Sequence, residues 1–530
     1  MNVLLPILSG VLFVLAFPRV GWGPVIFIAL VPLLLSLKDA GPRARFLRGW
    51  LTGFVGTLLM QYWLAGTLVR MSGFSWPLAI AGLGVYSAVI GLQWAIFAWL
   101  YAPVRRWSGR VGWLLTVPLL YTAFEHVFPS IFSLSIGHAL YDHPVLIQTA
   151  EWAGVFGPAV LIMCVTCVVT ATLEEIKKRR AGVLFGPTAI TAVWMIVIAL
   201  GLVRMERIRD APSRSKTTVA IVQPNVTIDE KRDADPRVRE AVFERTVELT
   251  QKAVRTHPSL VVWPEGGFPF YFDSGGSGEE AFERPTRAQR YTARLARLAL
   301  ESGVDIAVGA LRRQEDQTRN SAILVPRTGT RPIIYDKRLL LMFGERIPLA
   351  DTFPSLVDAI PGTSHYAAGD SFAAFPADNL LWVPSICYES IFSDFTRDGL
   401  NAPDGGGDVL LNLTNDVWFG DTAAADQHLM LQTMRAVEDR VWLVRATNTG
   451  ISAFVAPTGQ IVARTEINTS VVLYGEMSIP EIPLSFYRRH GNVIPLCLWV
   501  LGLLFLGYRW RKTTRVNNMR RTQVGTKDAP

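Results

Sequence analysis

Long apolar stretches occupy both ends of this chain, and its basic residues cluster in alternate links between them. A helix that crosses a bilayer core needs about 20 apolar residues. Half of all residues are hydrophobic, and only 18% are charged. The sequence therefore predicts a membrane-embedded α-helical bundle of about eight transmembrane helices. The candidate stretches are residues 2–17, 21–37, 49–69, 77–101, 111–129, 153–173, 182–203 and 492–508.

The distribution of Lys and Arg predicts how these helices are oriented. Basic clusters follow the second, fourth and sixth stretches, and a basic tail follows the eighth. The other links carry little more than Arg19 and Arg70. Because cytoplasmic loops are rich in Lys and Arg, both termini are predicted to be cytoplasmic and residues 204–490 to lie outside, in the periplasm of a bacterium. A soluble protein with buried apolar helices would not sort its charges by loop.

The net charge of +8 follows from these clusters. It indicates membrane topology, because no surface that combines basic and aromatic residues is evident, and nucleic acid is not a predicted partner. The predicted organisation has three parts: a seven-helix bundle over residues 1–203, an extramembrane domain over 204–490, and a last transmembrane helix with its basic tail over 491–530.

The pattern changes after Thr217. Short β-branched runs such as Thr218–Val222, Leu260–Trp263 and Val409–Asn412 alternate with helical patterns. Several runs are continuously apolar, as expected for strands that are buried on both faces. One helix is predicted over 236–256, with Asp235 as its N-cap and Pro236 at its first position. The extramembrane domain is therefore predicted to be α/β. The sequence contains no repeat, no phosphate-binding Gly loop and no metal-ligand cluster, so no metal site is predicted.

Three short segments of this domain carry residues suited to thiol chemistry. Cys387 is its only thiol and follows the apolar run Leu380–Pro384. Glu265 follows Leu260–Trp263, and Lys337 follows a strand-like run. A thiolate is the reactive form of Cys, and a nearby base or positive charge generates it. Three reactive groups at three strand ends are predicted to meet at one edge of a sheet.

The charges of these groups suggest their roles. Glu265 is predicted to act as the general base for the thiol. Lys337 is predicted to stabilise a tetrahedral oxyanion, with the backbone N–H of Tyr388 as a second donor. Glu345 and Glu389 are predicted to position Lys337 and polarise the site. Each signal is weak by itself, because an isolated Glu or Lys is usually a solvated surface residue and an isolated Cys is often a buried small hydrophobe.

In combination, the three segments resemble the carbon–nitrogen hydrolase (nitrilase) superfamily, whose triad is Glu, Lys and Cys. The matching residues are Glu265 in WPEG, Lys337 in YDKRLLLMFGE and Cys387 in ICYES. With the eight predicted spans, the chain resembles the apolipoprotein N-acyltransferase family of the bacterial inner membrane. This resemblance implies an αββα sandwich and adds the motifs around Trp418-Phe419 and Arg445–Gly450, with Trp418 and Phe419 as candidate substrate contacts.

The resemblance also implies a ping-pong acyl transfer at Cys387. A phospholipid would donate an acyl chain to give a thioester. The α-amine of a diacylglyceryl-cysteine on a lipoprotein would then accept it. No cofactor is required, and we expect a monomer. Membrane spans suit this reaction, because extracting a lipid into water costs about 0.8 kcal/mol per CH₂.

The chain departs from the family pattern in two places. Family members often carry a Trp after the first strand, but Asn225–Arg232 has none, and Met342 replaces a Pro before Phe343-Gly344-Glu345. The loop with four aromatics, Phe268, Phe270, Tyr271 and Phe272, is a candidate lipid-facing lid in place of the Trp. The alternative is that these rings pack in the protein core.

Three other functions remain compatible with the sequence. A membrane-anchored amidase would use the same triad with water as acceptor, because acceptor choice depends on the exclusion of water. A transporter with an accessory domain would need intramembrane charges, for which Glu125 is the main candidate. A paralogue of the family would acylate a different amine.

Overall fold

The computed structural model describes residues 3–177, 185–273, 286–314, 317–347, 352–353, 365–403 and 406–525. By their internal contacts the residues form two units. We call Met1–Tyr62, Ala81–Val203 and His490–Pro530 the helical unit, and Trp63–Ile80 and Arg204–Arg489 the sheet unit.

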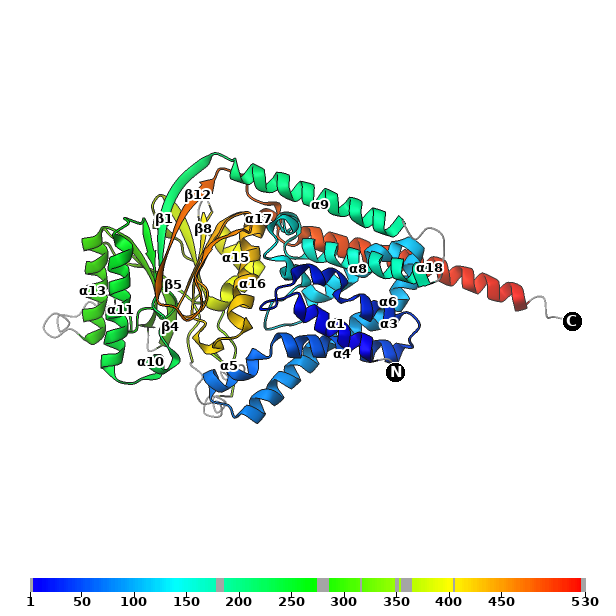
Figure 1. Ribbon diagram of the computed structural model, residues 1–530, viewed down its shortest axis with the longest axis horizontal. Helices are drawn as coiled ribbons and strands as arrows, with labels where there is room; N and C mark the ends of the chain where they lie inside the picture. Colours follow the sequence, from blue (N-terminus) through cyan, green and yellow to red (C-terminus); the bar gives the residue numbers. More distant parts are fainter. Residues whose placement is uncertain are drawn as a thin grey trace. The chain divides into compact units, whose positions relative to one another are not determined.

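Three helices of the described chain are long and apolar enough to cross a membrane: Trp76–Gly109, Phe156–Lys177 and Val493–Lys512. Two shorter apolar helical segments, Leu4–Leu15 and Gly23–Leu37, lie near the N-terminus. The seventh predicted stretch begins at 182–184, outside the described residues. Figure 1 shows the helices: α1 (Leu4–Leu15), α2 (Ile26–Ala29), α3 (Val31–Leu37), α4 (Pro42–Met60), α6 (Trp76–Val127), α7 (Ala150–Ala153), α8 (Phe156–Lys177), α9 (Phe185–Arg209) and α18 (Val493–Gly525).

Helix α6 contains the fourth and fifth predicted stretches, separated by a kink. Gly109 lies at the kink with φ 79° and ψ −169°, a conformation that only Gly adopts readily. The basic residues Arg105 and Arg106 lie just before the kink. Further along, Glu125 accepts hydrogen bonds from Ser135 Oγ at 2.6 Å and Ile136 N at 2.9 Å, so this carboxylate ties the helix end to the following loop.

One ionic cluster joins three of the links that the charge pattern places on the same side. Glu174, near the end of α8, accepts hydrogen bonds from Arg105 at 2.6 and 2.8 Å and from Lys38 at 3.0 Å. Lys38 directly follows α3. The ends of the second and sixth predicted stretches and the link after the fourth therefore meet within the helical unit.

The sheet unit contains two six-stranded mixed sheets, with strand orders β12-β1-β2-β3-β4-β5 and β11-β10-β9-β8-β7-β6. In each sheet three neighbouring strands are parallel, β1-β2-β3 and β7-β8-β9, and the remaining pairs are antiparallel. The strands are β1 (Ser213–Gln223), β2 (Leu260–Val262), β3 (Asp305–Gln314), β4 (Gln317–Val325), β5 (Ile333–Asp336), β6 (Phe375–Ala377), β7 (Leu380–Ile386), β8 (Val409–Thr414), β9 (Trp442–Thr447), β10 (Ala453–Val455), β11 (Ile461–Arg464) and β12 (Val471–Pro480).

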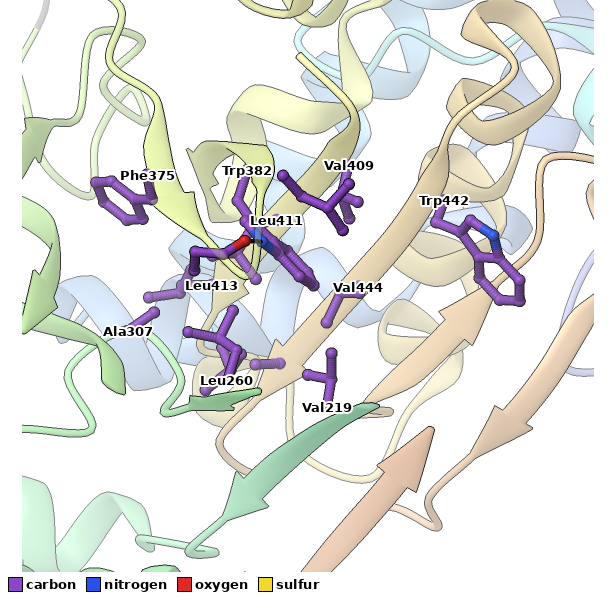
Figure 2. Close-up of a cluster of buried hydrophobic side chains, with 14 of the residues drawn as sticks. Val219, Leu260, Ala307, Phe375, Trp382, Val409, Leu411, Leu413, Trp442 and Val444 are labelled. Atoms are coloured by element: carbon purple, nitrogen blue, oxygen red, sulfur yellow. Dashed lines mark hydrogen bonds between the residues drawn. The ribbon is translucent and has the colours of Figure 1, made fainter. Parts of the chain in front are cut away.

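Apolar side chains of both sheets meet in one buried cluster. Val219, Leu260 and Ala307 come from the first sheet, whereas Trp382 and Leu411 come from the second, and they lie together in Figure 2. Burial of a Val, Leu or Phe side chain contributes about 1.5–3 kcal/mol. This shared core fixes the two sheets relative to each other. The strand ends of both sheets therefore keep fixed positions relative to one another.

Helices cover the outer face of each sheet. Helices α11 (Pro236–Val254) and α13 (Arg287–Ser302) pack on the first sheet through residues such as Phe243 and Leu295. Helices α15 (Ser393–Asn401) and α16 (Ala423–Asp439) pack on the second through Leu400 and Leu429. The order of layers is helix, sheet, sheet, helix (Figure 1). Two short helices, α10 (Ile228–Arg232) and α17 (Phe486–His490), complete this part.

A segment from the first part of the chain belongs to the sheet unit. Helix α5 (Trp63–Ser72) was expected within the bundle of residues 1–203, but it groups with the sheets. Arg70 donates hydrogen bonds to the carbonyl oxygens of Trp418 at 2.8 Å and Phe419 at 2.7 Å, and Trp63 Nε1 donates to Gln427 at 3.0 Å. These contacts explain the grouping.

Candidate active site

Glu265, Lys337 and Cys387 come together from two sheets. Glu265 follows β2 and Lys337 follows β5, both in the first sheet, whereas Cys387 follows β7 in the second. The expectation that all three meet at one edge of one sheet was wrong in this respect. The ammonium of Lys337 lies 3.5 Å from Glu265 Oε1, and both groups act electrostatically on the Cys387 thiol. The packing between the sheets therefore sets the geometry of the site.

Lys337 is almost fully buried, with 2% of its side chain exposed, and Glu345 is its main partner. The ammonium lies 2.7 Å from Glu345 Oε2 and 2.9 Å from Oε1. Burial alone would lower the pKa of Lys337, but the charges of Glu345 and Glu265 outweigh it and raise that pKa well above its usual value. Lys337 is therefore a fixed positive charge at neutral pH.

Glu345 is held as a carboxylate. Burial favours its neutral form, but Lys337 and the hydrogen bond from the backbone of Leu341, at 2.9 Å, lower its pKa. An isolated carboxylate in such a place would take up a proton. The pair thus keeps both of its members charged.

Asn320 on β4 orients both carboxylates, and nothing in the sequence pointed to it. Its side-chain amide donates to Glu265 Oε1 at 2.7 Å and to Glu345 Oε1 at 2.9 Å. Oε1 of Glu265 thus accepts hydrogen bonds from Asn320 and Lys337, whereas Oε2 accepts no hydrogen bond from the described residues. Asn320 leaves that second oxygen as the one suited to take a proton.

Glu389 connects the segments that carry Lys337 and Cys387. Its carboxylate is fully buried and accepts hydrogen bonds from the backbone N–H groups of Arg338 at 2.7 Å, Leu339 at 3.0 Å and Ile386 at 2.7 Å. The hydroxyl of Tyr335 donates to it at 2.9 Å. Burial raises the pKa of Glu389, although the backbone donors oppose this. Glu389 therefore anchors the backbone beside both residues, and it does so without a hydrogen bond to the Lys337 ammonium.

Cys387 sits at a strained turn between β7 and a short 3₁₀ helix, Cys387–Ile391. Its φ of 52° is in the left-handed region, which costs a non-Gly residue on the order of 1–3 kcal/mol and is typical of functional sites. The carbonyl of Cys387 accepts hydrogen bonds from Asn412 at 3.2 Å and Gln432 at 3.3 Å, and these offset the strain.

The thiol of Cys387 is protonated at neutral pH. Burial raises its pKa to about 12, the charge of Glu265 adds to this, and the charge of Lys337 opposes it. A thiolate therefore forms only when a base removes the proton. Glu265 is the carboxylate whose charge acts most strongly on the sulfur. Tyr388, the next residue, stacks edge-on against Phe392 at 4.8 Å.

A buried polar network supports the turn from the side of the second sheet. Asp416 pairs with Arg445 at 2.7 Å and with His428 at 2.9 Å, and Arg445 donates to Gln432 at 2.6 Å. Burial would raise the pKa of Asp416, but Arg445 and His428 lower it. Through Gln432 this network reaches the Cys387 carbonyl, so the motifs around Asp416 and Arg445 support the turn that carries Cys387.

The aromatic loop after Glu265 is core, in contrast to the expectation of a lipid-facing lid. Phe268, Phe270 and Phe272 are buried in the cluster under α11 and α13. The ring of Phe270 stacks on Tyr291 at 4.0 Å. These contacts remove the three rings from any surface. Tyr271 is the exposed member, at 41%.

Trp418 and Phe419 lie in the loop after β8, beside α5 and α10. Phe419 packs on Trp63 at 5.2 Å between ring centroids. The ammonium of Lys231 lies 5.0 Å from the Trp418 ring centre, and the Arg232 guanidinium lies 5.7 Å from it. Both aromatics are partly exposed. No cluster of His, Cys, Asp and Glu suited to a metal ion occurs among the residues described.

Comparison with known proteins identifies the family to which the chain belongs. Residues 218–483 match the carbon-nitrogen hydrolase family, so the sheet unit contains a domain of that class. Residues 9–168 match the apolipoprotein N-acyltransferase N-terminal domain. An apolipoprotein N-acyltransferase of Geobacter metallireducens is 32% identical over 507 residues, covering 92% of each chain. The chain belongs to the apolipoprotein N-acyltransferase family.

Other similar proteins include an apolipoprotein N-acyltransferase of Bdellovibrio bacteriovorus, 27% identical over 534 residues, which cover 94% of this chain and 92% of that protein. Among solved structures, a carbon-nitrogen hydrolase superfamily protein of Xanthomonas campestris aligns with a TM-score of 0.36 and 20% identity, over 50% of this chain and 91% of its own. A Nesterenkonia amidase aligns with a TM-score of 0.38 and 16% identity, over 53% and 95%.

Proposed function

We propose that this protein N-acylates the N-terminal diacylglyceryl-cysteine of lipoproteins and takes the acyl chain from a membrane phospholipid. The observation that carries the proposal is that Glu265, the Lys337–Glu345 pair and the Cys387 turn come together in a chain of this family. The apolar helices of the helical unit suit an enzyme whose two substrates are both lipids.

In the first half-reaction, Glu265 takes the proton of the Cys387 thiol. The sulfur attacks the carbonyl carbon of a phospholipid ester, and Lys337 stabilises the resulting oxyanion, with the Tyr388 N–H as second donor. The C–O bond then breaks. The lysophospholipid leaves as an alcohol after taking the proton back from Glu265, and a thioester remains on Cys387.

In the second half-reaction, the free α-amine of the lipoprotein cysteine attacks the thioester carbonyl. The C–S bond breaks, Glu265 accepts the amine proton and returns it to the sulfur, and an amide forms. Lys337 stabilises the second oxyanion as it does the first. Every step is a proton or acyl transfer, so it needs no redox partner.

The proposal includes the topology. We propose eight spans, cytoplasmic termini and a periplasmic catalytic domain in the bacterial inner membrane. The charge pattern supports this, and so do the contacts of Glu174 with Lys38 and Arg105, which join residues near three of the basic links. A monomer suffices, because both sheets and all the proposed catalytic groups belong to one chain.

Intact-mass analysis tests the chemistry directly. Incubation of the purified protein with a phospholipid should add the mass of one acyl chain, and Cys387→Ser should abolish the adduct. Addition of a diacylglyceryl-cysteine peptide should discharge the adduct to an amide. Discharge to free fatty acid at the same rate with and without the peptide would instead identify an amidase-like hydrolase. An adduct of equal amount on Cys387→Ser would refute the nucleophile.

A further inference from the structure

Three cationic side chains surround Trp418, and none of them forms an ion pair within the described chain. Lys231 and Arg232 approach its ring at 5.0 and 5.7 Å. Arg70 binds the carbonyl oxygens of Trp418 and Phe419, and its own carbonyl accepts a hydrogen bond from Arg232. The neighbouring carboxylate, Glu230, is paired with Arg245 at 2.9 Å instead. The cluster therefore has no directly paired carboxylate among the described residues, although the charges of Glu265 and Glu345 also act on Lys231.

The cluster is fixed in place and does not depend on a flexible loop. Helix α10, which carries Lys231 and Arg232, begins with a capping box between Thr227 and Glu230. The preceding residue, Val226, is bound on both sides by Asn448, at 2.7 and 2.8 Å. Arg232 is exposed, so an anion in solution can reach its guanidinium.

The cluster borders the catalytic groups. A Cβ atom on Gly266, the residue after Glu265, would lie 4.0 Å from the Lys231 ammonium. Lys231 also interacts electrostatically with Glu265 and Cys387. Lys231 is exposed at the surface, so a ligand can reach it from solvent, although burial of its ammonium lowers its pKa.

We propose that Lys231 and Arg232, held against Trp418 by Arg70, bind the phosphodiester of the acyl donor while its ester lies at Cys387. This deepens the proposed function and rests on it. A glycerophospholipid has its phosphate a few bonds from its ester groups, which matches a cation cluster next to the nucleophile. The acceptor, a diacylglyceryl-cysteine, carries no phosphate. The subsite would therefore select the donor. After the first half-reaction the lysophospholipid would leave the subsite, and the acceptor could then bind at Cys387.

The test compares two donors that differ only in the phosphate headgroup. Phosphatidylglycerol and a diacylglycerol with the same acyl chains are given to the purified full-length protein in uncharged detergent, and acylation of Cys387 is followed by intact mass. We expect faster acylation from the phospholipid. Arg232→Gln should slow it by about ten- to a hundredfold, the worth of a hydrogen bond to a charged group, and should leave diacylglycerol use unchanged. Arg232→Lys should recover most of the rate.

Two further variants make the result specific. Lys231→Gln should also lose the preference for phospholipid, although it should slow both donors because Lys231 lies near Cys387. Arg239→Gln removes an exposed charge from α11 and should not change the acylation rate with either donor. Equal losses with both donors in Arg232→Gln, or no loss at all, would overturn the subsite. Either result would mean that Lys231 serves only to balance the charge of Glu265.

A binding arm separates this proposal from the proposed chemistry. Native mass spectrometry of Cys387→Ser, which cannot form a thioester, should show more bound phosphatidylglycerol than diacylglycerol. The added Arg232→Gln change should abolish that difference, and glycerol 3-phosphate, but not sodium chloride of equal ionic strength, should compete. Competition by inorganic phosphate without any preference for the phospholipid would mean that the cluster binds free phosphate and would refute the donor subsite. If binding behaves as expected but no acyl-enzyme forms, the acyl-transfer proposal fails and the subsite stands.

Discussion

Neutralising Glu345 is the sharpest test of how the site is held together. Glu345→Gln removes the carboxylate that contacts the Lys337 ammonium at 2.7 and 2.9 Å and leaves Glu265, at 3.5 Å, as the remaining charged partner. Removing one partner of a buried ion pair costs about 3–5 kcal/mol. We expect the lower end, about 3 kcal/mol, because Glu265 remains and Gln can still accept the Leu341 hydrogen bond.

The same change should slow acylation. Without Glu345, Lys337 is drawn toward Glu265, where it neutralises the base and leaves the place where it stabilises the oxyanion. Loss of one oxyanion donor costs about 100- to 1,000-fold, and we expect the lower figure because the ammonium is still present. The rate of acyl-enzyme formation measures this effect, and unfolding in detergent measures stability.

The stability that Glu345 contributes should depend on pH. The pKa of Glu345 is lowered in the folded protein, so its stabilisation is present above its unfolded pKa and is lost as the pH falls through the lowered folded value. The stability gap between Glu345→Gln and the unchanged protein should therefore be full at pH 7 and close under strongly acidic conditions. Glu244→Gln, which breaks the exposed pair with Arg294, is the matched control and should cost at most about 1 kcal/mol. A Glu345→Gln protein no less stable than this control, and acylated at the normal rate, would refute the reasoning.

Three other changes test separate parts of the structure. Phe270→Ser should cost about 3–5 kcal/mol because Phe270 is core, whereas Tyr271→Ser, at the exposed neighbour, should leave the melting temperature nearly unchanged; equal effects would contradict the burial. Asp439 is buried and accepts no hydrogen bond from the described residues, and burial raises its pKa to about 8. Because folding must then keep a proton on Asp439, stability should fall as the pH rises from 4 to 8, and Asp439→Asn should raise the melting temperature at pH 8 more than at pH 5; a uniform shift at both pH values would argue against that pKa. A phosphatase fused after Arg464 should be active and one fused after Arg511 inactive, and the reverse pattern would overturn the proposed orientation.

The sequence predicted much of the sheet unit because its signals are local. The helix expected over 236–256 is α11, and Asp235 caps it by accepting from Arg237 N at 2.8 Å. Signals of the same kind predict a helix over 287–302, which is α13, and a hairpin turn at Pro457–Gln460, which joins β10 to β11. Helix caps, turns and apolar periodicity depend on neighbouring residues, so they can be predicted from the sequence without knowledge of the fold.

The parts that the sequence did not reveal depend on contacts between distant residues. Asn320 reads as an ordinary polar residue before an apolar run, and only the folded structure places it on β4 between Glu265 and Glu345. Arg70 reads as a loop charge after an apolar run, although it holds the Trp418 loop. The aromatic loop was expected to face lipid because its composition is apolar, but the surface it packs against is supplied by α11 and α13.

The segment without the expected Trp illustrates how such contacts change an interpretation. Residues 225–232 contain no aromatic side chain, but the indole of Trp418, from another loop, lies against Lys231 and Arg232. The surroundings of Glu265 thus combine an aromatic face with two cations, where the family pattern suggests a Trp from the same segment. A phosphodiester needs cations and an acyl ester needs apolar surface, so this arrangement suits the phospholipid donor proposed above. If that is the reason for it, a variant that returns an aromatic to this segment, Arg232→Trp, should lose phospholipid preference while it keeps acylation from diacylglycerol.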